Sequence, residues 1–122
     1  MKVFIPSLDK PPTTGKGFFY NRLAKALKNI GVDVSEIEDD TCNIAVNNVR
    51  VRLGKAKLQV VRIDGVYHYT GRNYKNLNKT IFKGYHQKSD GIIYQSNFSK
   101  NMADKYLGKF KGRTAIINNG AD

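Results

Sequence analysis

Short apolar runs alternate along the chain with longer stretches in which apolar residues recur at helical spacing. The short runs are bounded by Gly, Pro, Asn or Asp, and several are rich in branched residues, which is the pattern of buried strands. The sequence therefore predicts six strands, at residues 2–6, 32–37, 43–49, 57–65, 90–96 and 113–118.

Three segments have the spacing of amphipathic helices. The first begins at Gly17 and stops at Gly31, and its apolar stripe consists of Phe19, Leu23, Ala26, Leu27 and Ile30. In the second, residues 72–88, one side carries Tyr74, Leu77, Ile81, Phe82 and Tyr85, and the opposite side carries Arg72, Lys75, Lys79 and Lys83. The third spans residues 97–108, with Ser96 or Asn97 as the expected N-cap and Gly108 as the stop.

Strands that alternate with helices pair in parallel through right-handed crossovers. We therefore expect an α/β fold, a three-layer Rossmann-like sandwich with a mostly parallel sheet of about six strands in a single domain. Ligands of such sheets lie at the carboxyl ends of the strands. The candidate segments for function are the turns after four of the strands, with the sequences TTGKG, DGVYHYTGRN, QSNFSK and NNGAD.

Composition agrees with a small globular domain. The chain has 122 residues, of which 40% are hydrophobic and 25% charged, and a domain of this size needs neither disulfides nor metal to form a core. No apolar run approaches the roughly 20 residues of a membrane-spanning helix. The first residues lack the pattern of a secretion signal, so a cytoplasmic protein is expected. Cys42, His68 and His86 do not have zinc-ligand spacing, so no metal is expected.

Lys and Arg outnumber Asp and Glu by 21 to 10, which gives a net charge of +11. Such an excess favours polyanionic partners, namely nucleic acid, anionic membranes, or phosphorylated or acidic sugars. The basic side of the second helix, with Arg72, Lys75, Lys79 and Lys83, has two interpretations. It is either a solvated helix face, the usual meaning of such a stripe, or a surface that contacts an anionic membrane or another polyanion.

The segment TTGKGFFYN precedes the first helix, a place where backbone N–H groups and the helix dipole attract anions. It lacks the first glycine and the Ser or Thr of a phosphate-binding P-loop. It also departs from the dinucleotide fingerprint, because Tyr20 stands where a third Gly or Ala should follow Gly15 and Gly17. A turn required only by chain geometry and a contact with an anionic or sugar ligand both remain open.

Polar and aromatic residues gather after the fourth strand. Asp64 is the candidate catalytic residue, as a base or as the group that orients a sugar hydroxyl, whereas Tyr67, His68, Tyr69 and Arg72 are suited to stack on or hydrogen-bond a polar ligand. The alternative is that Asp64 only closes an Asp-Gly turn. We favour the functional interpretation, because the segment lies where an α/β sheet places its ligands.

From Arg62 to Asp122 the chain resembles the second half of the N-terminal domain of retaining GT-B glycosyltransferases of family four. The segments DGIIYQSNFSK and INNGAD are the most specific parts of this resemblance. Upstream, PPTTGKGFFYNRLAKALKNIGVDV is similar to the first glycine loop and helix of the family. The resemblance covers essentially the whole chain.

The resemblance implies a protein of two Rossmann-like domains that face each other across a cleft. Residues 1–118 would be the N-terminal domain, which binds a glycan or other hydroxyl acceptor rather than nucleic acid, and residues 119–122 would begin the interdomain linker. A C-terminal domain, in cis or in trans, would bind the nucleotide-sugar, which is a co-substrate and not a cofactor. The expected reaction is sugar transfer with retention, without bound metal, and this half alone is expected to be inactive.

The position of the turns and the resemblance together predict a cleft that includes Gly15, Lys16, Gly17, Asp64, Gly65, Tyr67, Arg72, Ser96, Asn97, Asn119 and Gly120. The glycines at 15 and 17 match the loop that lies against the donor phosphates or the transferred sugar. Residues 64–67 match the loop that faces the acceptor, residues 96 and 97 the turn after the fifth strand, and residues 119 and 120 the passage into the second domain. The competing hypothesis is a non-catalytic basic α/β module that binds nucleic acid or an anionic membrane through Arg72, Lys75, Lys79 and Lys83.

Overall fold

The computed structural model describes residues 1–6, 8, 15–48, 54–63 and 78–118. In chain order, its elements are β1 (Lys2–Phe4), α1 (Gly15–Asn29), β2 (Asp33–Ser35), β3 (Ile44–Asn48), β4 (Leu58–Ile63), α3 (Lys79–Gln87), β5 (Gly91–Tyr94), α4 (Asn97–Tyr106) and β6 (Arg113–Ile116). Each of the predicted strands is present, within a few residues of its expected bounds.

The six strands form one sheet in the order β2-β1-β3-β4-β5-β6, and every neighbouring pair is parallel. This confirms the predicted α/β fold. Strands of a parallel sheet are covered on both faces by the connecting helices, and all residues of β5 are accordingly buried. The strand order reverses between β1 and β3, because β2 lies on one side of β1 and the later strands lie on the other.

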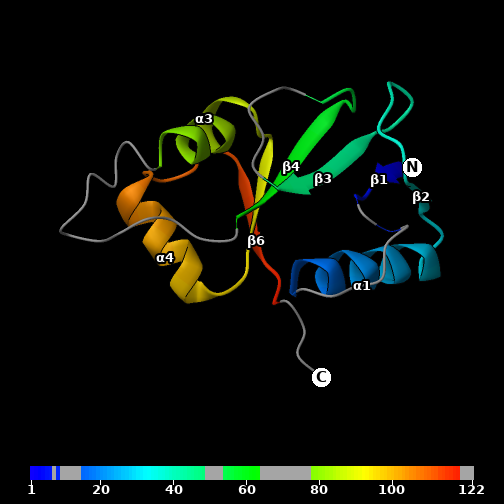
Figure 1. Cartoon of the computed structure of the whole chain (residues 1–122), viewed down its shortest axis with the longest axis horizontal. Coiled ribbons are helices and arrows are strands. Elements are labelled where there is room, and N and C mark those ends of the chain that lie inside the picture. The colour runs from blue at the N-terminus through cyan, green and yellow to red at the C-terminus, as the bar shows by residue number, and fades with distance from the viewer. Residues whose placement is uncertain (7, 9–14, 49–53, 64–77, 119–122) are drawn as a thin grey trace.

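Two apolar clusters, one on each face of the sheet, produce the three layers seen in Figure 1. The α1 cluster consists of Val3, Ile5, Phe19, Tyr20, Ala24, Val46 and Ile93. The α3–α4 cluster consists of Val61, Ile63, Tyr85, Ile92, Tyr94, Ala103, Leu107 and Phe110. Side chains alternate between the faces of a strand, and β5 accordingly contributes Ile93 to the first cluster and Ile92 and Tyr94 to the second.

The ends of the helices match the sequence signals. Ser96 has an extended backbone, and its Oγ accepts a hydrogen bond from the Ser99 N–H at 3.1 Å, as an N-cap does. Gly31 and Gly108 follow α1 and α4 with φ of 86° and 89°, which is the left-handed region where glycine carries no steric penalty. The predicted cap and both predicted stops are thus confirmed.

The buried side of α1 differs from the predicted stripe. Ala26 is exposed and Ile30 is 75% exposed, whereas Tyr20 and Ala24 are buried. Ile30 follows the last residue of α1, so the helical spacing no longer governs its direction. The helix also begins earlier than expected, at Gly15, so the predicted glycine turn lies in its first turn.

The second predicted helix is described from Lys79 onward, and its residues 72–77 lie outside the described part of the chain. Tyr85 is fully buried, as the predicted stripe requires, but Phe82 is 45% exposed. The helix packs on the sheet through Tyr85 and Ile81. Successive helical residues are turned by about 100°, which directs Phe82 away from the sheet.

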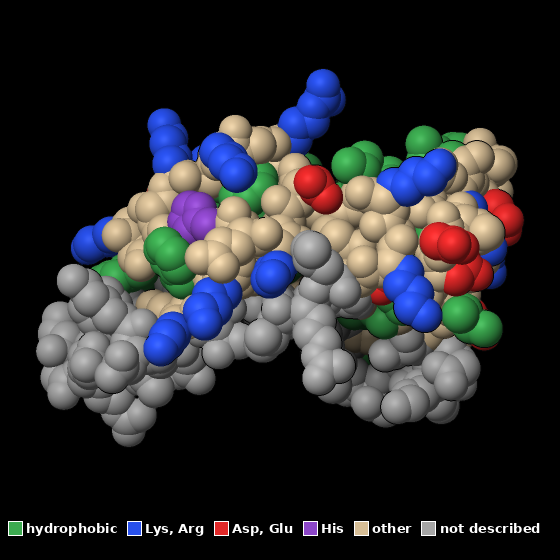
Figure 2. Space-filling view, turned by 90° about the horizontal axis from the view of Figure 1, so that it is seen from above, with side chains coloured by type: hydrophobic (Ala, Val, Ile, Leu, Met, Phe, Trp, Pro, Cys, Tyr) green, Lys and Arg blue, Asp and Glu red, His purple; other side chains and the backbone are tan. Residues whose placement is uncertain are grey.

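Charge differs between the two ends of the molecule. Residues 33–40 contain five acidic side chains, whereas residues 78–118 contain eight Lys or Arg and two Asp. Figure 2 shows acidic side chains mostly at the end that holds β2, with Lys and Arg side chains among them, whereas basic side chains predominate at the end that holds α3 and α4. None of the described helices is long and apolar enough to cross a membrane.

Candidate ligand-binding edge of the sheet

The carboxyl ends of the parallel strands lie along one edge of the sheet. The register aligns Ile63 of β4 with Tyr94 of β5, and Tyr94 with Ile116 of β6. One residue earlier in β4, Arg62 is aligned with Asn48, the last residue of β3. Doubly wound sheets bind ligands at this edge, at the place where the strand order reverses, which here is between β1 and β3.

The first turn of α1 holds the predicted residues Gly15, Lys16 and Gly17. The Gly17 carbonyl accepts a hydrogen bond from Asn21 Nδ2 at 2.8 Å, so this turn is held by a side chain of the same helix. Backbone N–H groups of a first helical turn point beyond the N-terminus and, with the helix dipole, attract negative charge. The two glycines therefore stand in a position suited to an anion, although within the helix rather than in a loop before it.

A hydrogen bond joins α1 to the end of β3. Tyr20 is 1% exposed, and its Oη donates to Asn48 Oδ1 at 2.7 Å. The residue that breaks the dinucleotide fingerprint thus connects the helix to the sheet through its hydroxyl. Next to Asn48, Asn47 is buried, and its Nδ2 has no hydrogen-bond partner in the structure as described.

Arg62 brings a buried positive charge to the same edge. It is 1% exposed, and its guanidinium carbon lies 4.8 Å from the centroid of the Phe19 ring of α1. A guanidinium over an aromatic face is attracted to the ring and stays charged at all physiological pH values. Arg62 thus connects the end of β4 to α1 through its contact with Phe19.

The turn between β5 and α4 supplies the predicted residues Ser96 and Asn97. Gln95 Nε2 donates to the Ile63 carbonyl at 3.4 Å, which ties the ends of β5 and β4 together. Ser96 Oγ is engaged as the cap of α4, so its first role is structural. Asn97 is the first residue of α4 and is exposed, which leaves its amide accessible at the edge.

The remaining predicted cleft residues lie outside the described part of the chain. These are Asp64, Gly65, Tyr67, Arg72, Asn119 and Gly120, and Lys75 of the basic face joins them. Their roles stay predictions. Lys79 and Lys83 of the basic face are described, and both are exposed on α3.

The sequence interpretation did not single out Asn47, Asn48 or Arg62 as part of a site. Their position at the ends of apolar strands could have identified them, because polar residues there lie at the ligand-binding edge of an α/β sheet. The burial of Asn47 and Arg62 and the contact of Asn48 with Tyr20 depend on the packing of α1, which local patterns do not reveal.

Behind the edge, the α3–α4 cluster contains a bonded pair of tyrosines. The hydroxyl groups of Tyr85 and Tyr94 form a hydrogen bond to each other, and both residues are fully buried. Burial raises the pKa of Tyr85, and the bond to Tyr94 raises it further. Burial likewise raises the pKa of Tyr94. Both hydroxyl groups therefore stay neutral near pH 7, and their hydrogen bond joins α3 to β5.

The fold and this edge define an α/β protein with a doubly wound parallel sheet and polar residues at the carboxyl ends of its strands. Within the described residues there is no group of three His, Cys, Asp or Glu side chains that could hold a metal ion. Comparison with family models, with curated proteins and with solved structures finds no match to this chain.

Proposed function

We propose that this chain is the acceptor-binding half of a retaining GT-B glycosyltransferase. Two lines of support combine: the resemblance of the segments around Gly15–Gly17, Ser96 and Asn118 to that family, and the polar carboxyl edge at which these segments meet the sheet. The observation that carries the proposal is the set of polar residues that joins the ends of β3 and β4 to α1, in which half-buried Asn48 accepts from buried Tyr20 and buried Arg62 lies against Phe19.

In this proposal the edge acts by positioning and by electrostatics. The first turn of α1 places the positive end of the helix dipole near a leaving nucleoside diphosphate, and fixed dipoles stabilise developing negative charge without reorganisation. The exposed amide of Asn97 orients a hydroxyl of the acceptor or of the transferred sugar. The nucleotide and the remaining catalytic groups belong to a donor-binding domain, in cis or in trans. The cellular compartment of this chain and any peripheral contact with a membrane would be those of the whole enzyme.

Sugar transfer is the direct test. The chain would be assayed alone and joined to the donor-binding domain of a retaining glycosyltransferase, with release of the nucleoside diphosphate measured over a panel of nucleotide-sugars and glycans. We expect transfer only by the joined form. Asn97→Ala should lower it about fivefold, the effect of one lost hydrogen bond to substrate. Asn101→Ala, also exposed on α4 but farther from its start, should leave it unchanged. A joined form that binds the nucleotide-sugar but neither binds a glycan nor transfers the sugar would refute the proposal.

A second candidate is the basic module that binds nucleic acid or an anionic membrane. The observation in its favour is the excess of eight basic over two acidic residues in the segment 78–118, with Lys79 and Lys83 exposed one helical turn apart. It predicts binding to polyanions that weakens steeply with salt. Exchange of these lysines for Glu should abolish such binding, and binding that persists in the exchanged variant would exclude this candidate.

A further inference from the structure

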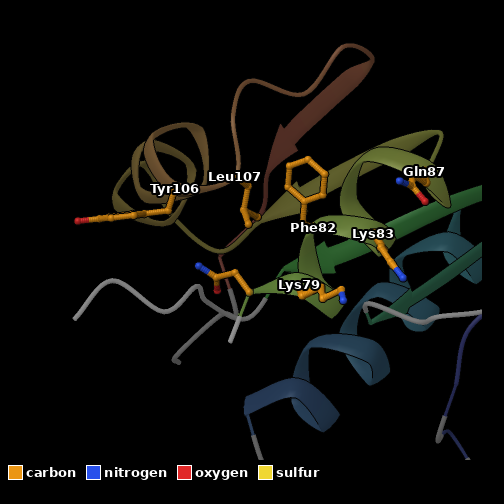
Figure 3. A pocket seen from close by; sticks show the side chains of 7 residues that line it. Lys79, Phe82, Lys83, Gln87, Tyr106 and Leu107 are labelled. Carbon is orange, nitrogen blue, oxygen red and sulfur yellow. The ribbon is translucent and has the colours of Figure 1, made fainter. Parts of the chain in front are cut away.

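A groove of about 430 Å³ opens between α3 and the end of α4. It is lined by Asn78, Lys79, Phe82, Lys83, Gln87, Tyr106 and Leu107. Its volume is within the range of small-molecule sites, about 300–1,000 Å³. None of the edge residues discussed above lines it, so it is a separate place on the molecule, and Figure 3 shows it from close by.

The apolar part of the groove is Phe82 with Leu107. Phe82 is 45% exposed although it is a large apolar side chain, while Leu107 beneath it is buried. In Figure 3 the Phe82 ring stands between α3 and the end of α4, next to Leu107. Covering an exposed aromatic ring is favourable by roughly 25 cal/mol for each Å² removed from water. This surface is therefore available to an apolar body.

The walls of the groove are fixed to each other. His86 Nε2 lies 2.6 Å from the Leu107 carbonyl oxygen, which links α3 to the end of α4. The Phe82 ring packs on the His86 ring at a centroid distance of 4.6 Å, and Tyr85 packs on Phe110 at 5.2 Å. A site held in this way exists before any ligand arrives, which reduces the ordering cost of binding.

One side of the groove is positively charged. Lys79, Lys83 and Gln87 follow each other at intervals of one helical turn on α3, so the two ammonium groups repel each other mildly. Among the residues that the structure describes, no acidic side chain lines the groove, and neither lysine has an ion-pair partner. The two acidic residues of the segment 78–118 interact with other groups. Asp104 forms an ion pair with Lys100 at 3.2 Å, and Asp90 accepts a hydrogen bond from the Gln59 N–H at 2.8 Å.

We propose that this groove binds an amphiphilic phosphate monoester. Its apolar body lies against Phe82 and Leu107, and its phosphate lies at Lys79 and Lys83, with Gln87 as a further donor. Lysine is a common phosphate ligand, and a small number of polar groups beside an apolar floor is the usual arrangement of such sites. The site does not depend on sugar transfer and holds whether or not the carboxyl edge binds a glycan.

Binding of 2-naphthyl phosphate to the ¹⁵N-labelled chain, followed by NMR, tests the proposal. Its two parts, 2-naphthol and inorganic phosphate, are the matched ligands. We expect the ester to shift amide signals of residues 79–87 and 106–107 and to bind about tenfold more tightly than either part, since a charged hydrogen bond adds to apolar burial. Equal binding of 2-naphthol, or shifts confined to other elements, would overturn the proposal.

Two pairs of variants distinguish binding in the groove from non-specific binding through surface charge or exposed apolar side chains. Lys83→Gln should weaken binding about two- to fivefold, as the loss of one exposed ion pair does, whereas Lys25→Gln, with the same charge change at an exposed position of α1, should not. Phe82→Ala should weaken binding more than Phe98→Ala, whose side chain is 69% exposed at the start of α4. Equal effects within either pair would refute the assignment.

The phosphate monoester has two natural sources, a soluble ester or the headgroup of phosphatidic acid. Vesicles of phosphatidylcholine with and without phosphatidic acid distinguish them by competition with the naphthyl ester. If vesicles with phosphatidic acid displace the naphthyl ester, and Lys83→Gln weakens this displacement, the groove binds the lipid headgroup. If they do not displace the ester, the groove binds a soluble ester. If the chain binds the anionic vesicles but not the free ester, the proposed groove site is refuted, and non-specific binding to anionic membranes is favoured.

Discussion

Replacing Tyr20 by Phe tests the contact that joins α1 to the end of β3. The Tyr20 Oη, on a side chain that is 1% exposed, donates to Asn48 Oδ1 at 2.7 Å. The substitution removes only this oxygen and leaves the ring packed against Phe19, with 5.6 Å between centroids. Asn48 is half-buried, so water can replace the lost donor. We therefore expect the free energy of unfolding to fall by about 1 kcal/mol, the middle of the range for such bonds.

Cys42 provides a readout of this loss. It is the only cysteine and is fully buried, so its reaction with a thiol reagent requires opening of the structure. With a slope of about 2 kcal/mol per M of urea, a loss of 1 kcal/mol lowers the urea midpoint by about 0.5 M. The slope itself should not change, and far-UV circular dichroism should give the same midpoint.

A double-mutant cycle shows whether the effect belongs to this bond. Asn48→Ala leaves the buried Tyr20 hydroxyl without its acceptor and should cost about 1–3 kcal/mol. The double variant should lose about 1 kcal/mol less than the sum of the single variants. Asn29→Ala, at an exposed position of α1, should stay within about 0.5 kcal/mol of the parent chain. Additive losses, or an unchanged midpoint for Tyr20→Phe, would show that α1 is not tied to β3 as described.

Three further predictions concern stability and are measured by urea unfolding. Ser96→Ala should cost about 1 kcal/mol because the cap of α4 is lost, and Ser96→Asn should retain most of it. Gly31→Ala should cost about 1–2 kcal/mol through backbone strain alone, because φ is +86° and an added Cβ meets nothing within 4 Å; Gly31→Asn should cost less. Burial raises the pKa of Tyr85 and of Tyr94 above the unfolded value, so the stability they provide is present below about pH 10 and lost above it. Tyr85→Phe should therefore flatten the fall of the midpoint between about pH 10 and 11.5.

The order of strands and helices followed from the sequence because it depends on local signals. Gly31 and Gly108 stop their helices through a backbone conformation that needs no partner, and Ser96 caps α4 through a bond to a residue three positions away. Parallel pairing then follows from the alternation of elements.

The predicted helix faces were less accurate, because burial depends on what lies opposite. Tyr20 is buried because its ring packs in the α1 cluster, and its hydroxyl donates to Asn48, 28 positions along the chain. Phe82 is exposed although it is apolar, because α3 meets the sheet through Tyr85 and the neighbouring surface is the groove. Arg62 is buried against Phe19, a contact that the alternation of strand residues alone does not indicate.

The distribution of charge determines the electrostatic field that acts on a ligand in the α3–α4 groove. Exposed charges farther apart than about 8 Å are largely screened at physiological salt, so the acidic segment 33–40 contributes little to the field in the α3–α4 groove. Binding there should depend on Lys79 and Lys83, and not on the net charge of +11. Binding in the groove that falls equally when any exposed lysine is neutralised would show that the site responds only to overall charge.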